Sequence, residues 1–197
     1  MTEIRFSGFG GQGIIRLGLI TGKAISLFDN KYATMTQSFG PEARGSACSS
    51  QVVVSEERVL YPYITNPEIQ VAMSQEAYEK YEPELRKDGI LIIDSDLVKL
   101  KPHRGKIKLY SIPSTRFAEE MGNRIFANLV MLGFFTAISK AVSPEAMKKA
   151  LPGLVPKRSL DINIKAFDKG YEFGVEVLSK EKQENEEKKT GDKKEKK

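Results

Sequence analysis

The stretch FSGFGGQG, residues 6–13, decides the fold, because it places a glycine-rich turn directly after the first strand-like segment of the chain. Residues 3–8 are rich in branched and aromatic side chains, a composition typical of a strand. Residues 13–28 then repeat apolar side chains at helical spacing. A strand, a tight turn and a helix in this order predict an α/β fold. The turn supplies the first candidate binding residues, which are Gly8, Gly10, Gly11, Gln12 and Gly13.

The rest of the chain alternates strand-like and helix-like segments. Strands are predicted at residues 32–38, 49–55, 69–74, 90–95 and 106–113. Helices are predicted at residues 75–89, 114–122, 123–141, 143–151 and 161–178. Pro83 should interrupt the first of these helices, and Ser143 should cap the fourth. Apolar strands separated by helices favour one three-layer αβα domain with a mostly parallel, Rossmann-like sheet.

The composition is that of a globular protein with a charged extension. Of its 197 residues, 40% are hydrophobic and 29% are charged, and the net charge is +5. Residues 180–197 hold 8 of the basic and 6 of the acidic residues and no hydrophobic side chain, so we expect a disordered tail there. Residues 1–179 are then the folded domain, and their near balance of charge argues against a nucleic-acid partner.

Neither a membrane protein nor a metal site is expected. The longest apolar stretch, residues 125–138, is too short to cross a bilayer. The N-terminus lacks the basic and then apolar plan of a signal peptide, so we expect a cytoplasmic protein. The single cysteine, Cys48, and the single histidine, His103, exclude an internal disulfide, a four-cysteine zinc site and an iron–sulfur cluster.

The glycine turn has three interpretations that the residues alone leave open. Backbone N–H groups at the start of a helix bind phosphate or another anion, and glycines also permit close packing against a helix or a subunit. The third interpretation is a dinucleotide, which requires an acid at the end of the second strand to hold the ribose. That strand ends in TQSFG, and the nearest earlier acid, Asp29, lies in the preceding turn. The missing acid argues against a nicotinamide cofactor.

A second candidate loop is QSFGPEARGSA, residues 37–47. Two opposite charges lie two residues apart in it, and a guanidinium group suits a phosphate or a carboxylate. A surface ion pair on a tight turn is the alternative. Because this loop and the glycine turn both follow strands, we expect them at one edge of the sheet. Its candidate residues are Gly40, Glu42, Arg44 and Gly45.

The third candidate segment is GNRIFANLVMLG, residues 122–133, in which Asn123 and Arg124 open an apolar helix. Asn128 lies within the apolar run, and a buried asparagine needs hydrogen-bond partners, so it faces either a neighbouring loop or an interface. A plain core helix is the alternative. No nucleophile elbow, Walker motif, zinc motif or catalytic dyad is present, so we assign no catalytic residue and expect no activity of the chain alone.

Three segments in this order, residues 6–13, 36–55 and 122–133, resemble the gamma subunit or gamma domain of 2-oxoacid:ferredoxin oxidoreductases. The resemblance covers residues 3–178 and implies a gamma-type catalytic domain. QSFGPEARGSACS and VAMSQEAYEKY are more similar to the 2-oxoglutarate branch, because the pyruvate branch usually has a second arginine where this chain has Ala43. The chain departs from the pattern at Ser46, where a second glycine is common, which affects only the local turn.

The resemblance implies an oxidoreductase complex of anaerobic metabolism. In such a complex, thiamine diphosphate, held with Mg on the alpha and beta subunits, attacks the 2-oxo carbon, and carbon dioxide leaves. Electrons then pass through [4Fe–4S] clusters in partner subunits to ferredoxin, and coenzyme A accepts the acyl group, which gives succinyl-CoA from 2-oxoglutarate. The gamma chain itself holds no cofactor.

Two contributions remain for the gamma chain. The resemblance implies that it assembles with the alpha, beta and delta-type subunits and that it forms the coenzyme A side of the active site. The phosphates of coenzyme A would lie near Gly10–Gly13 and Arg44, with Glu42 orienting the arginine. The start of the third segment would line the same site through Asn123, Arg124 and Asn128.

Other functions stay open at this point. A pyruvate, branched-chain 2-oxoacid or indolepyruvate enzyme would use the same kind of gamma subunit. A stand-alone NAD(P)-binding protein would bind a nicotinamide nucleotide without partners. A scaffold module would assemble with partners, yet mutation of its loops would leave the kinetics of coenzyme A unchanged.

Overall fold

Six strands of the described residues pair into one sheet, in the order β2-β3-β1-β4-β5-β6. The computed structural model describes residues 1–39, 47–102 and 106–194. The strands are β1 (Thr2–Phe9), β2 (Tyr32–Ser38), β3 (Ala47–Ser55), β4 (Ile69–Ala72), β5 (Ile90–Asp94) and β6 (Lys108–Ile112). The α-helices are α1 (Ile14–Phe28), α2 (Gln75–Tyr81), α3 (Ser114–Glu120), α4 (Ala127–Ser139), α5 (Pro144–Ala150) and α6 (Leu160–Lys194). Short 3-10 turns are η1 (Glu82–Glu84), η2 (Arg124–Phe126) and η3 (Lys157–Ser159).

The sheet is mostly parallel, with one antiparallel insertion. β1, β4, β5 and β6 pair in parallel, whereas β3 runs antiparallel to both β1 and β2. In a Rossmann dinucleotide-binding unit, the strand after the first helix lies directly beside the first strand. Here β3 separates β2 from β1, so the predicted α/β class is confirmed but the pairing at this edge differs from that unit.

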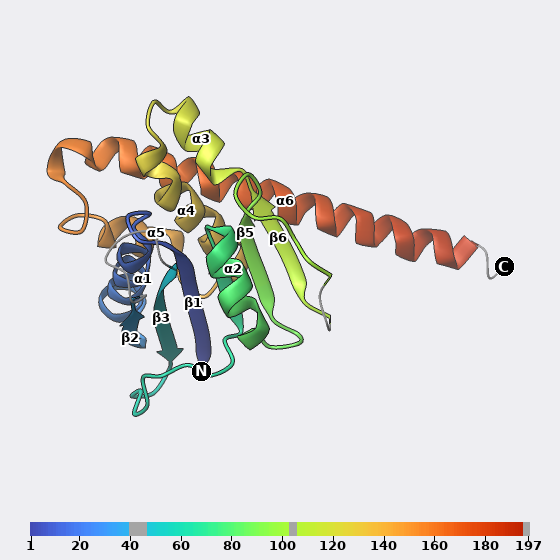
Figure 1. Ribbon diagram of the computed structural model, residues 1–197. Helices are drawn as coiled ribbons and strands as arrows, with labels where there is room; N and C mark the ends of the chain where they lie inside the picture. The colour runs from blue at the N-terminus through green and yellow to red at the C-terminus, as the bar shows by residue number, and fades with distance from the viewer. Residues whose placement is uncertain (40–46, 103–105, 195–197) are drawn as a thin grey trace.

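Helices cover both faces of the sheet, which gives the three predicted layers (Figure 1). α1 and α4 pack on the face that carries Phe6, whose ring meets that of Phe135 edge-on at 4.9 Å between centroids. α2 packs on the opposite face. There the buried Arg5 side chain lies 5.0 Å from the ring centre of Tyr81 and 2.6 Å from the carboxylate of Glu84. Pro83 interrupts the helix after α2 as predicted, and Ser143 caps α5 by accepting a hydrogen bond from the Ala146 N–H.

α4 and α6 cross at two glycines, although glycine has a low propensity for the interior of a helix. A Cβ atom added at Gly170 would lie 1.8 Å from the carbonyl oxygen of Val130, and one added at Gly133 would lie 1.9 Å from that of Phe167. Each glycine therefore allows the backbones of the two helices to touch. Ordinary helix propensity counts Gly170 against α6, but the close crossing requires it.

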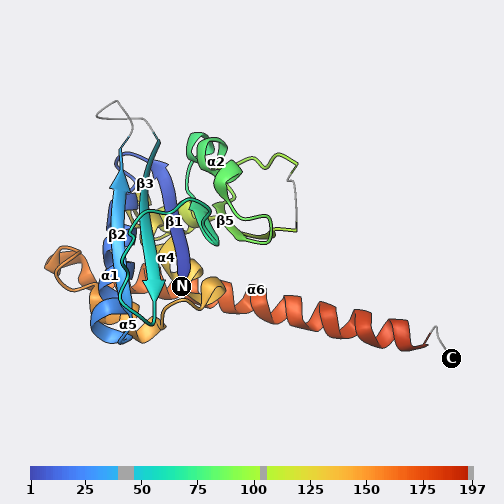
Figure 2. The same cartoon turned by 90° about the horizontal axis from the view of Figure 1, so that it is seen from below.

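The end of α6 departs from the expectation for the charged tail. We expected residues 180–197 to lack regular structure, whereas α6 continues to Lys194 and projects past the sheet in both views (Figures 1 and 2). Lysine, glutamate and glutamine are good helix formers, which explains why the helix extends although it buries little. The domain boundary at residue 179 stays a prediction. None of the helices in the described parts of the chain has the length and apolar character needed to span a bilayer.

Candidate functional site at the glycine turn

The glycine turn lies at the edge of the sheet where β1, β4 and β5 end. β3 begins at the same edge, because Phe9 at the end of β1 pairs with Ala47 at the start of β3. The second candidate loop connects β2 to β3, so its flanking residues lie beside the glycine turn, as predicted. Four of its predicted site residues lie outside the described residues, namely Gly40, Glu42, Arg44 and Gly45.

The conformation of the turn requires glycine. Gly11 and Gly13 have φ values of 98° and 78°, a left-handed region that side chains disfavour. Gln12 braces the turn, since its Oε1 accepts a hydrogen bond from the Phe9 N–H at 2.6 Å and its Nε2 donates to the Met73 carbonyl at 2.9 Å. Both polar atoms of the Gln12 amide thus fix the turn to the end of β4. Gln12 also lines the pocket described below, and its role as a binding residue stays a prediction.

The turn opens a pocket of about 450 Å³ between the starts of α1 and α4. Its lining includes two arginines, and no carboxylate of the described residues lines it. Neither arginine forms an ion pair with a described carboxylate. The residues of the lining on which the argument depends are Gly11, Gly13, Arg16, Thr115, Arg124 and Asn128.

The start of α1 adds backbone donors to the same pocket. Gly13 is the N-cap and provides no side-chain hydrogen bond to the first turn, which contains no acid. The first N–H groups of a helix have no partner within the helix, and the helix dipole favours an anion beside them. Uncapped N–H groups beside Arg16 and Arg124 therefore suit a phosphate or a carboxylate.

Three predicted residues at the start of α4 have different surroundings. Asn123 caps η2, because its Oδ1 accepts a hydrogen bond from the Ile125 N–H at 2.9 Å. Ile125 begins the apolar stretch of residues 125–138, yet it is 62% exposed and lines the pocket. Asn128 is buried, and its Oδ1 has no hydrogen-bond partner among the described residues. The structure thus brings Arg124 and Asn128 to the glycine turn, while Gly8 lies in β1 and Gly10 is exposed.

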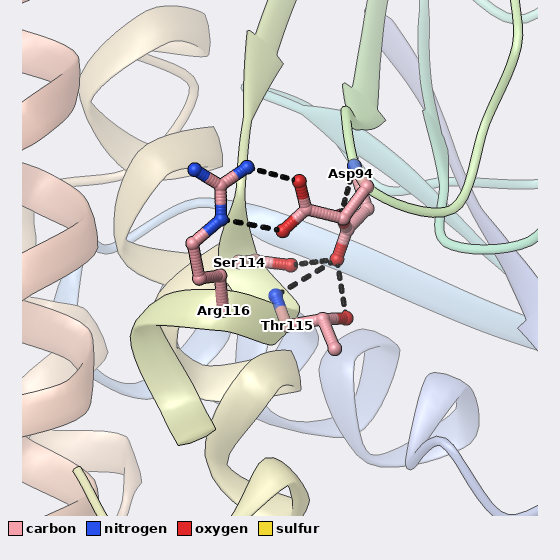
Figure 3. A network of polar contacts seen from close by, with 5 residues as sticks. Asp94, Ser114, Thr115 and Arg116 are labelled. Carbon is pink, nitrogen blue, oxygen red and sulfur yellow. Dashed lines mark hydrogen bonds and ion pairs between the residues drawn. The ribbon is translucent and has the colours of Figure 1, made fainter. Parts of the chain in front are cut away.

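A buried aspartate forms hydrogen bonds with the start of α3 (Figure 3). Asp94, the last residue of β5, is fully buried, and its Oδ2 accepts hydrogen bonds from Ser114 Oγ at 2.5 Å, Thr115 N at 3.0 Å and Thr115 Oγ1 at 2.7 Å. Its Oδ1 accepts from the Asp96 N–H at 3.0 Å. The carboxylate of Asp96 in turn pairs with the Arg116 guanidinium. This network fixes the start of α3 to β5 and thereby positions Thr115 at the pocket.

The position of Asp29 excludes it as the acid that would hold a ribose at the glycine turn. Asp29 lies at the far end of α1 and accepts hydrogen bonds from the N–H and the hydroxyl of Ser143, at 2.7 and 2.6 Å. It lines a larger pocket of about 640 Å³ there, away from the glycine turn. Because α1 separates Asp29 from the turn, the two do not form a dinucleotide site. We assign the candidate site to the smaller pocket because it alone of the two combines uncapped helix N–H groups with the predicted residues.

Comparison with known proteins places the chain in a family. Residues 3–173 match the family model described as pyruvate ferredoxin/flavodoxin oxidoreductase. The chain belongs to this family. It is 48% identical to 2-oxoglutarate synthase subunit KorC of Methanocaldococcus jannaschii over 89% of this chain and 95% of that protein.

Two solved structures of the family support the fold. The gamma subunit of a keto/oxoacid ferredoxin oxidoreductase from Geobacter sulfurreducens is 40% identical, with a TM-score of 0.79 over 89% of this chain and 99% of that one. The 2-oxoglutarate:ferredoxin oxidoreductase from Magnetococcus marinus, solved with 2-oxoglutarate, coenzyme A and succinyl-CoA bound, is 26% identical. Its TM-score is 0.76 over 88% of this chain and 31% of its own chain. The resemblance to oxidoreductase gamma subunits is thus confirmed.

Two polar residues of the pocket were not among the predicted site residues. Arg16 lies three residues after Gly13 in the first turn of α1, and its position at a helix start beside a glycine turn was a usable signal. Thr115 is about a hundred residues away in sequence, and nothing local marks it. Cys48 pairs with Gly8 across β1 and β3, and burial raises the pKa of its thiol. In the part of the chain that the structure describes, no group of three metal-ligating side chains comes together.

Proposed function

We propose that this chain is the gamma-type subunit of a 2-oxoglutarate:ferredoxin oxidoreductase. That enzyme decarboxylates 2-oxoglutarate oxidatively with coenzyme A, yields succinyl-CoA and carbon dioxide, and passes electrons to ferredoxin. The observation that carries the proposal is the 48% identity to a 2-oxoglutarate synthase subunit along nearly its whole length. The ligands of the Magnetococcus marinus enzyme, 2-oxoglutarate, coenzyme A and succinyl-CoA, support the same substrate.

The division of labour follows from the residues of this chain. A [4Fe–4S] cluster needs four cysteine ligands, and the chain has one cysteine, so the clusters belong to partner subunits. Thiamine diphosphate and Mg are likewise assigned to the partner alpha and beta subunits. The chain then works inside a cytoplasmic complex of alpha, beta, gamma and delta-type subunits that delivers electrons to ferredoxin.

The pocket at the glycine turn takes the phosphates of coenzyme A in this proposal. Coenzyme A carries a pyrophosphate and a 3′-phosphate, and the pocket offers uncapped N–H groups of α1 with the guanidinium groups of Arg16 and Arg124. No described carboxylate of the lining opposes an anion there. The pocket binds and orients coenzyme A, and the partner subunits supply the reacting groups.

The complex itself provides the first test. It should be isolated anaerobically through an affinity tag on this chain, its other chains identified by mass spectrometry, and ferredoxin reduction measured with four 2-oxoacids. We expect co-purified subunits with a thiamine-diphosphate motif and cluster-binding cysteines, and the highest kcat/KM with 2-oxoglutarate. A higher kcat/KM with pyruvate, a branched-chain 2-oxoacid or indolepyruvate would show that this acid is the substrate instead of 2-oxoglutarate. A lone homo-oligomer that binds a nicotinamide nucleotide would overturn the proposal.

A second test separates a coenzyme A site from a plain subunit contact. Arg44→Ala in the assembled complex should raise the KM for coenzyme A and leave co-purification intact. The matched control is Arg86→Ala, because Arg86 is an exposed arginine at the opposite edge of the sheet, paired with Glu68 and Asp88. Lost co-purification with an unchanged KM would assign the loop of Arg44 to subunit contact instead.

A further inference from the structure

β2 forms the outer edge of the sheet and lacks the features that usually protect such an edge (Figure 2). Among the described strands only β3 pairs with it, and the register runs without a bulge from Tyr32 to Ser38. Its sequence, YATMTQS, contains neither a charged residue nor a proline. An edge strand exposes a row of N–H and C=O groups to other strands, and proteins commonly block that row with charge, proline or a bulge. β2 is therefore open to pairing.

The opposite edge of the sheet is protected. β6 has five residues and begins with Lys108. The hydroxyl of Tyr110 in this strand donates a hydrogen bond to Glu181 of α6, so a helix contacts this edge. The open edge is thus specific to β2.

One side of α1 faces the same edge as β2 and is also uncharged. Its members recur at intervals of four, three and four residues and are all at least partly exposed, namely Ile15, Leu19, Gly22 and Ser26. Leu17, Ile20 and Ala24 lie on the opposite side of the helix and are fully buried, where α1 contacts α4 and α5. Because α4 packs over β1, the exposed side of α1 is turned toward β2 and away from the centre of the sheet.

Gly22 has no packing role within its own chain. A Cβ atom added there would meet no atom within 4 Å, whereas Gly133 and Gly170 lie where two helices cross. A glycine in a helix interior weakens the helix relative to alanine. At Gly22 the missing side chain leaves room for a second helix to approach α1 from outside.

We propose that β2 and α1 form an interface between two copies of this chain, in which the two β2 strands pair antiparallel about a twofold axis. Such an axis brings identical surfaces together, so a charged residue beside it would face its own copy. A pair of different chains could use opposite charges, and the absence of all charge from β2 therefore favours a second copy. With Met35, the middle residue of the strand, on the axis, Thr34 lies opposite Thr36 of the second copy. Threonine pairs stabilise antiparallel strands.

The spacing of the helices agrees with this arrangement. α1 lies over both outer strands, because a Cβ atom added at Gly18 would lie 3.1 Å from Met35 Cε in β2 and 2.6 Å from Ser50 Oγ in β3. Two strand spacings, or about 10 Å, then separate the two α1 helices. Packed helices lie about 8–10 Å apart. The antiparallel strands also place the two glycine turns at opposite edges of the joined sheet, so the pairing blocks neither candidate site.

Self-association of the isolated full chain provides the test. One strand pair and one helix pair make a small interface, so sedimentation equilibrium should show a monomer at about 1 μM and a dimer near about 1 mM. Thr34→Lys combined with Thr36→Lys places like charges opposite each other twice and should abolish the dimer. Thr34→Lys combined with Thr36→Glu places opposite charges there and should restore it. The two variants change the same positions, so each controls for the other, and circular dichroism checks that both fold.

Gly22→Ala separates the stability of the chain from its pairing. At about 1 μM, where the chain is a monomer, the variant should have a higher Tm than the wild type. Its self-association should be about tenfold weaker, because a methyl group from each copy enters between the two α1 helices. Unchanged or stronger self-association would exclude the contact between these helices.

The other outcomes are equally decisive. A monomer at every concentration, or a dimer that Thr34→Lys with Thr36→Lys leaves intact, would overturn the proposal. A dimer that Thr34→Lys with Thr36→Glu fails to restore would refute the twofold register. If the double-lysine variant costs the assembled complex a different subunit while the isolated chain stays monomeric, that subunit occupies the edge and the second copy is excluded. None of these measurements involves coenzyme A or 2-oxoglutarate, so their failure leaves the proposed function untouched.

Discussion

Replacing Gly170 by alanine should destabilise the chain, although alanine is the better helix former. In a helix interior, alanine is favoured over glycine by up to about 1 kcal/mol. At Gly170 the new methyl group would lie 1.8 Å from the Val130 carbonyl oxygen and 3.0 Å from the Phe134 nitrogen. Both neighbours are backbone atoms of α4, so no side chain can rotate away, and the two helices must separate.

The expected size follows from these two opposing effects. Overpacking a well-packed interior costs about 1–3 kcal/mol, and contact with backbone atoms places Gly170→Ala at or above the upper end. After subtraction of the helix-propensity gain, a net loss of about 2 kcal/mol remains. For a chain of this length, each kcal/mol lowers Tm by about 2–4 °C, so Tm should fall by about 4–8 °C.

Gly22→Ala is the matched control. Gly22 also lies within a helix, α1, but a Cβ atom added there would meet no atom within 4 Å. Its replacement should raise stability by up to about 1 kcal/mol. Thermal and urea unfolding of the full chain, followed by circular dichroism, measure both variants. If Gly170→Ala stabilises the chain as Gly22→Ala does, the described crossing of α4 and α6 is wrong.

Two further perturbations test other parts of the structure. Burial and a hydrogen bond to Glu181 raise the pKa of Tyr110 to about 12. The stability that the protonated phenol contributes is therefore present below the unfolded pKa of about 10 and is lost as pH rises toward 12. The difference between the spectrophotometric titrations of wild type and Tyr110→Phe reports the Tyr110 phenol alone. If that difference shows a phenol with a pKa near 10, the contact of α6 with β6 is wrong. Asp94→Asn removes the charge that accepts bonds from Ser114 and Thr115, so urea unfolding should show a loss of about 3 kcal/mol; a loss below about 1 kcal/mol would refute the role of the network.

Local patterns predicted the elements of this fold well, because side-chain periodicity depends on neighbouring residues. Which strands pair is a different question, and nothing in the segments at β1, β2 and β3 shows that β3 lies between the other two. Gly133 and Gly170 illustrate the same limit. Each weakens a helix when considered alone, and its value becomes clear only when the facing helix is known.

The candidate site was predictable where its residues belong to a motif. The glycine turn meets Arg124 and Asn128 at the pocket, which brings together the first and third of the three segments. Arg16 could have been predicted from its place in the first turn of α1. Thr115 was not, because its position at the pocket depends on a hydrogen bond to Asp94 at the end of another strand.

In the proposed function, this chain forms the coenzyme A side of a 2-oxoacid:ferredoxin oxidoreductase. The most direct measurement is the steady-state kinetics of the assembled complex carrying Arg16→Ala together with Arg124→Ala, with Arg86→Ala as control. Loss of two charge-assisted contacts to phosphate should raise the KM for coenzyme A at least about tenfold. The KM for 2-oxoglutarate should stay unchanged. An unchanged KM for coenzyme A in an intact complex would contradict the account.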